Sequence, residues 1–159
     1  MVWLGHLISI ILAVLLGAAI GLERELSGKS AGLRTNILIC LGAAVFTIIS
    51  IELASGKDDS IARIAAQIVT GVGFLGAGAV IQDRRGVHGL TTAATIWLVA
   101  SIGMACGARY HGLAITSTVI ALIVLVGLLK LSKPLDRYVE KHKPETAPDE
   151  QPEERRSAL

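Results

Sequence analysis

Residues 64–82 read IAAQIVTGVGFLGAGAVIQ, which is 19 consecutive positions without a charged side chain. Four further charge-free stretches, 17 to 23 residues long, occupy residues 1–22, 35–51, 86–108 and 110–129. A helix needs about 20 apolar residues, each rising 1.5 Å, to cross the roughly 30 Å hydrocarbon core of a bilayer. The runs therefore predict an all-α integral membrane helical bundle with about five transmembrane helices, at approximately residues 2–22, 35–54, 62–82, 90–108 and 112–131.

The composition also favours a membrane protein over a soluble domain. Apolar residues make up 52% of the chain and charged residues only 18%, whereas a soluble domain carries roughly 25% charged residues. A soluble helical protein would show apolar faces at helical spacing rather than helices that are apolar all round. The first run has no positive segment before it, so we expect a permanent span rather than a cleavable signal peptide.

The distribution of Lys and Arg predicts the orientation, because cytoplasmic loops carry their excess. An outside N-terminus places 12 of these residues on the inner side and 3 on the outer side, so we predict N-out and C-in. Residues 1–131 then form the transmembrane domain, and residues 132–159 form a charged cytoplasmic tail. The tail is poor in large apolar residues and should be mostly disordered, with residues 132–143 either solvated or a short amphipathic helix on the membrane.

Glycines recur at close spacing in three of the runs. Gly71, Gly73 and Gly76 satisfy the G-x-G-x-x-G pattern, but dinucleotide binding needs a preceding strand and a polar mouth, which an uncharged run does not offer. Small residues instead let the backbones of membrane helices approach each other. We therefore predict close helix packing, within the bundle or between protomers, at Gly17, Gly21, Gly71, Gly73, Gly76, Gly78, Gly103 and Gly107.

Polar residues at helical spacing begin the third predicted span. Asp59, Arg63, Gln67 and Thr70 fall within a sector of about 80° around a helix, and we expect this polar stripe to enter the bundle from the outer face. The alternative is a helix start, with Asp at the N-terminus and Arg reaching outward. Carboxylates suit hydrated Mg²⁺, and the weak candidates for such a site are Glu52, Asp58 and Asp59.

The inner face is predicted to hold a larger polar network. Acidic residues close the first span, while basic residues begin the second span and fill the loop after the third, so opposite charges can interlock there. The network either anchors the helices and sets their orientation, or forms a docking face for another membrane protein or a gate. Its candidate residues are Glu23, Arg24, Glu25, Arg34, Asn36, Asp83 and Thr91.

No catalytic constellation is visible in the sequence. There is no Ser-His-Asp, Cys-His or metal-ligand spacing, so we predict a protein that is not an enzyme, holds no cofactor beyond a weakly supported Mg²⁺, and binds no nucleic acid. His6, His88 and His111 are expected to be interfacial polar residues rather than a proton relay. Cys40 and Cys106 are expected to be small packing residues.

Four blocks of sequence resemble the MgtC/SapB family of bacterial inner-membrane proteins. In chain order they read GLERE at 21–25, AGLRTN at 31–36, RIAAQIVTGVGFLGAG at 63–78 and VHGLTTAATIW at 87–97. Many members of that family carry a soluble C-terminal domain with an ACT-like fold, so this chain resembles a short form that lacks it. The matched positions at which we expect function are Glu23, Arg24, Arg34, Asn36, Asp59, Arg63, Gln67, Asp83 and Thr91.

The resemblance implies a multi-pass protein of the bacterial inner membrane, linked to adaptation to low magnesium and stress and associated with virulence. It further implies a regulator that binds other inner-membrane proteins, such as ATP synthase or uptake systems. We also expect the chain to form a homo-oligomer in the lipid bilayer. The alternative that the resemblance leaves open is a transporter or channel for Mg²⁺ or another ion.

Overall fold

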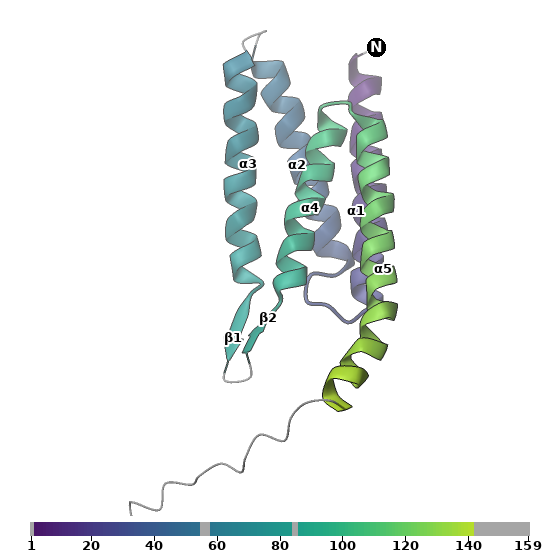
Figure 1. Cartoon of the computed structure of the whole chain (residues 1–159). Helices are drawn as coiled ribbons and strands as arrows, with labels where there is room; N and C mark the ends of the chain where they lie inside the picture. The colour runs from purple at the N-terminus through teal and green to yellow at the C-terminus, as the bar shows by residue number, and fades with distance from the viewer. Residues whose placement is uncertain (1, 55–57, 84–85, 142–159) are drawn as a thin grey trace, which may run out of the picture.

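The computed structural model describes residues 2–54, 58–83 and 86–141, although side chains at 58–62, 64, 81–83 and 128–141 lie outside the described part. Its elements are five helices with a β-hairpin between the third and the fourth (Figure 1). Their bounds are α1 Val2–Leu26, α2 Leu33–Leu53, α3 Asp58–Gly78, β1 Ile81–Asp83, β2 Gly86–His88, α4 Leu90–Gly107 and α5 His111–Lys141.

The predicted all-α membrane bundle is confirmed. Among the described residues, α1, α2 and α4 are long and apolar enough to cross a membrane, while α3 and α5 contain the shorter apolar helical stretches Ala65–Gly78 and His111–Gly127. Large apolar side chains cover the outside of the bundle, and Phe74 on α3 is 82% exposed. A soluble protein rarely exposes so much contiguous apolar surface, whereas lipid is a favourable solvent for it.

The core lies where α1, α2 and α4 meet, because α2 packs against both of the others more extensively than α3 packs against any helix. The buried side chains there are small, for example Ala13, Cys40, Ala44 and Cys106. Small residues let helix axes approach closely. Membrane helices depend on such close packing because the hydrophobic effect does not drive helices together in lipid. α3 stands at one edge of the bundle, with the hairpin at the end opposite the N-terminus (Figure 1).

The end of the third span differs from the prediction of residues 62–82. α3 ends at Gly78, and the next residues form β1, which pairs antiparallel with β2 in the register Ile81 with His88 and Asp83 with Gly86. Absence of charge cannot separate a helix from a short strand, and the β-branched Val80 and Ile81 suit a strand. The chain returns through Gly89, whose φ of 88° suits glycine, and a Cβ there would overlap the Ala79 carbonyl oxygen.

The last helix also differs from the predicted span 112–131, because α5 runs on to Lys141 and includes Pro134. Residues 132–141, for which the sequence left open a solvated end or a short amphipathic helix on the membrane, therefore continue the fifth helix. The rest of the charged tail, residues 142–159, lies outside the described residues.

Candidate functional site

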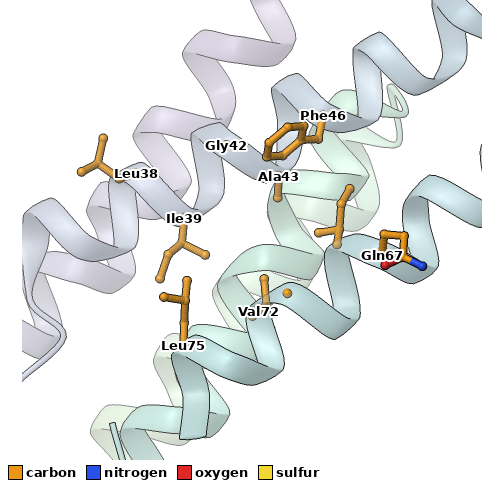
Figure 2. A pocket seen from close by; sticks show the side chains of 10 residues that line it. Leu38, Ile39, Gly42, Ala43, Phe46, Gln67, Val72 and Leu75 are labelled. Atoms are coloured by element: carbon orange, nitrogen blue, oxygen red, sulfur yellow. The ribbon is translucent and has the colours of Figure 1, made fainter. Parts of the chain in front are cut away.

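An apolar groove opens between α2 and α3 along one side of the bundle (Figure 2). Its volume is about 570 Å³, and it is lined by Leu38, Ile39, Gly42, Ala43, Phe46, Gln67, Ile68, Gly71, Val72 and Leu75. Gly42 stands on the α2 wall and Gly71 on the α3 wall. A Cβ added at either glycine would meet no other part of the described chain within 4 Å, so both walls are open rather than closed by packing.

Gln67 supplies the polar side chain of the groove. It lies about 14 Å along α3 from the first residue of that helix, close to the middle of the span. Its side chain is exposed, and no described residue donates a hydrogen bond to its amide or accepts one from it. An amide in hydrocarbon without a partner costs roughly 2–7 kcal/mol, so this position favours a neighbour that can hydrogen-bond with it.

The expectation that the polar stripe enters the bundle is wrong. Arg63, Gln67 and Thr70 are all exposed, and the Thr70 hydroxyl donates only to the Ala66 carbonyl of its own helix, at 3.0 Å. Val72, which also lines the groove, is buried in the bundle instead, because an apolar side chain packs there without unsatisfied groups. The side chain of Asp59, the fourth residue of the stripe, lies outside the described part.

At the other end of the bundle, Arg24 is buried with only 1% of its surface exposed. Its guanidinium donates to both carboxylate oxygens of the adjacent Glu23, from Nε at 2.5 Å and from Nη2 at 2.8 Å. The Ser27 hydroxyl donates to the same carboxylate at 2.8 Å. Among the described residues, Glu23 therefore pairs with Arg24 of its own helix rather than with Arg34 of α2.

Glu25 and Asn36 hold the turn between α1 and α2. A Glu25 carboxylate oxygen accepts the backbone N–H of Leu33 at 2.9 Å, which satisfies one free donor at the start of α2. The buried Asn36 amide nitrogen donates to the carbonyls of Ala31 and Gly32, at 2.7 and 2.8 Å. These residues thus shape the end of the bundle at which α1 ends and α2 begins.

The remaining inner-face candidates are not brought together in the described structure. Arg34 is exposed and forms no ion pair with a described acidic residue. Thr91 is exposed at the start of α4, and its carbonyl accepts the Thr95 hydroxyl at 2.8 Å. Asp83 lies on β1, and its side chain is outside the described part. Arg84 and Arg85 are outside the described residues altogether.

The glycines divide into two groups. A Cβ at Gly17 would lie 2.8 Å from the Cys40 Cβ, and one at Gly21 would lie 2.8 Å from the Leu33 Cα. Gly103 and Gly107 of α4 likewise lie directly against backbone carbonyls of α2. By contrast, Gly76 makes only an ordinary contact with α4, and a Cβ would meet open space at Gly71, Gly73 and Gly78.

Two polar contacts at the end of the bundle where α1 begins were missed by reasoning from the sequence, which named no partner for any histidine. His6 Nε2 lies 3.3 Å from a Glu52 carboxylate oxygen, and Ser9 Oγ lies 3.0 Å from His111 Nε2. The spacing of His6 and Ser9, one turn apart on α1, was the available signal. The partners on α2 and α5 could be found only once the helices were placed side by side.

The described residues contain no group of three or more His, Cys, Asp or Glu side chains that could hold a metal ion. Of the three weak candidates, Glu52 contacts His6, while the side chains of Asp58 and Asp59 lie outside the described part. What the described side chains can do is bind: an apolar helix or chain in the groove, and polar or charged groups at the two ends.

Residues 10–133 match the model of the MgtC family. YhiD of Escherichia coli (strain K12) is 47% identical over 127 residues, which cover 75% of this chain and 58% of the relative. Protein MgtC of Salmonella typhimurium (strain LT2) is 47% identical over 117 residues, covering 74% and 49%. Protein MgtC of Brucella abortus (strain 2308) is 46% identical over 128 residues, covering 80% and 51%.

The chain spans about half the length of the curated relatives that it matches. No solved structure matches it. The family match over most of the chain agrees with the apolar helical bundle, so this is a multi-pass bacterial inner-membrane protein that belongs to the MgtC family.

Proposed function

We propose that this protein is a non-enzymatic regulator that binds other inner-membrane proteins, and that a transmembrane helix of the partner docks in the groove between α2 and α3. The observation that carries the proposal is the open groove itself, with Gln67 among its lining residues and an uncovered glycine on each wall. Family membership and the magnesium in one relative's name support a role in adaptation to low magnesium or stress.

The groove suits a helix because of how helices associate in lipid. Association there depends on close packing at small residues and on hydrogen bonds between helices. Gly42 and Gly71 leave room for a third backbone, and the Gln67 amide can both donate to and accept from a polar side chain on it. ATP synthase and uptake systems, the partners implied by the family resemblance, contain many such helices.

A photo-crosslinking amino acid placed at position 71 tests the docking site. In native membranes we expect a covalent product with another membrane protein, identified by mass spectrometry, and no such product from position 127. Gly127 lies on α5 and also faces open space, so it is a matched control for a lipid-facing glycine. Labelling of lipid alone, or equal protein labelling from both positions, would contradict the proposal.

A substitution that fills the groove and the mass of the crosslinked product give that experiment two further readouts. Gly42→Leu fills the groove from the facing wall without a clash inside the chain, so it should abolish the product while the protein still accumulates in the membrane. A product of twice the chain's mass would mean that the occupant is a second copy, which is the homo-oligomer expected from the sequence.

Ion transport is the alternative function, because one relative carries the name "Putative magnesium transporter YhiD". Within a single chain, Arg63, Gln67 and Thr70 face outward, so a polar path along them would need several α3 helices to assemble. Proteoliposomes that enclose a Mg²⁺-sensitive dye test this directly. Flux above that of empty liposomes, lost in an Asp59→Ala, Arg63→Ala variant, would favour transport, and absence of flux would favour the regulator.

A further inference from the structure

A second cavity, of about 320 Å³, lies at the end of the bundle where α1 begins. The start of α1 and the ends of α2 and α4 surround it. His6, Glu52 and Arg109 are among its lining residues, together with the apolar Ile48 and Ile51. The cavity therefore combines a carboxylate, a guanidinium and an imidazole with an apolar wall, and nothing in the groove-docking function uses them.

Arg109 is held in an unusual backbone conformation at this cavity. Its φ is 65°, in the left-handed region that disfavours a side chain by roughly 1–2 kcal/mol. It closes α4 in the position usually taken by glycine, and the next N–H, of Tyr110, bonds to the Ala105 carbonyl at 2.8 Å. A glycine at position 109 would be less strained, so the presence of an arginine there indicates a function for its guanidinium.

The guanidinium of Arg109 lies over α1 without a partner of opposite charge. A Cβ at Gly5 would be 3.0 Å from its Nη2 atom, so the absence of a side chain at Gly5 makes room for it. No described residue forms an ion pair or a side-chain hydrogen bond with Arg109. Guanidinium groups bind phosphate through two parallel hydrogen bonds, and this one is free to do so.

Glu52 places a negative charge on the same cavity. His6 Nε2 contacts one of its carboxylate oxygens at 3.3 Å, and 56% of the Glu52 side chain is exposed. The imidazole thus positions the carboxylate while leaving it open to a cation. The rim consequently offers a cation site at Glu52 and an anion site at Arg109, which is the charge pattern complementary to a zwitterion.

Two aromatic residues show the depth of the cavity in the membrane. Trp3 is 86% exposed and Tyr110 is 66% exposed, and both lie next to residues that line or flank the cavity. Exposed Trp and Tyr gather at the level of the lipid headgroups. A zwitterion at that depth, beside an apolar wall, is most simply supplied by the bilayer.

We propose that this cavity binds the headgroup of an amine-bearing zwitterionic phospholipid of the phosphatidylethanolamine type. Arg109 binds the phosphate, Glu52 accepts hydrogen bonds from the ammonium, and Ile48 and Ile51 contact the glycerol and the first methylenes. The site is distinct from the groove between α2 and α3, and it requires no protein partner.

Native mass spectrometry of the purified full chain tests the proposal with phosphatidylethanolamine and phosphatidylglycerol of identical acyl chains. We expect the native protein to retain phosphatidylethanolamine preferentially, and Arg109→Gly to weaken that binding on the order of tenfold, the loss of a charge-assisted contact. Arg109→Gly also relaxes the backbone, so a folding defect is not expected. Lys29→Gln removes one exposed cation at the opposite end and should leave retention unchanged.

Glu52→Gln separates the two halves of the site. It keeps the side-chain shape and removes the negative charge that attracts the ammonium. The preference for phosphatidylethanolamine over phosphatidylglycerol should therefore disappear, while binding of the phosphate persists. Equal retention of both lipids by the native protein, or undiminished retention by Arg109→Gly, would overturn the proposal. Displacement of the lipid by an equal concentration of free O-phosphoethanolamine would overturn the assignment to a lipid.

Discussion

At the scale of single residues, the described structure buries a charged side chain within the helical bundle. Arg24 is buried, and its guanidinium is matched to the carboxylate of the residue before it. Burying a charge is costly unless it is paired and hydrogen-bonded. The adjacent Glu23 compensates the charge within one turn of α1, so neutralising Arg24 does not require a charge from another helix.

Glu23→Ala should therefore destabilise the protein strongly, by about 3–5 kcal/mol, because it leaves the buried Arg24 charge uncompensated. The measurement is thermal unfolding in detergent micelles. Leu26→Ala, at an exposed position of the same turn, serves as the control and should change the midpoint little. Equal midpoints for the two variants would show that Arg24 reaches water instead.

Arg109 allows a second prediction at this scale. Arg109→Gly and Arg109→Ala remove the same guanidinium, but only glycine is relaxed at a φ of 65°. The glycine variant should therefore unfold at the higher temperature, with a difference of about 1 kcal/mol. If alanine proved as stable as glycine, the left-handed turn at the end of α4 would not exist in the membrane-embedded protein.

At the scale of elements, the closely spaced glycines of different helices have different roles. The pairs on α1 and α4 lie against α2, whereas three of the four glycines of α3 face open space. The spacing alone left both readings open. The difference arises because α2 packs between α1 and α4, while α3 packs only along one face.

Gly103→Ala and Gly71→Ala should accordingly have opposite effects on stability. A Cβ at Gly103 would overlap the Cys40 carbonyl, so α2 and α4 must separate, which costs about 1–3 kcal/mol. A Cβ at Gly71 meets nothing, and alanine favours a helix over glycine by about 1 kcal/mol. Thermal unfolding of both variants measures this, and destabilisation of Gly71→Ala in the isolated chain would mean that α3 packs differently.

At the scale of the whole molecule, the orientation is predicted from charge rather than from packing, because the helices would pack equally well in either direction across the membrane. The count of 12 Lys and Arg against 3 predicts that both the turn after α1 and the C-terminal end of the chain face the cytoplasm. Green fluorescent protein fused after Leu159 should fluoresce in the cell, and alkaline phosphatase at the same point should be inactive. The reverse result would invert the topology.

Four blocks of sequence indicated the family, and run length, composition and charge determined the membrane class and the number of helices. The membrane class and the helix number follow from bilayer thickness and the cost of burying charge, which act on each segment by itself. Only the tertiary structure decided which way the stripe of α3 faces, which glycines are covered, and that His6, Glu52 and Arg109 line one cavity. Those facts depend on how helices far apart in the chain are rotated and paired, and no segment carries that information alone.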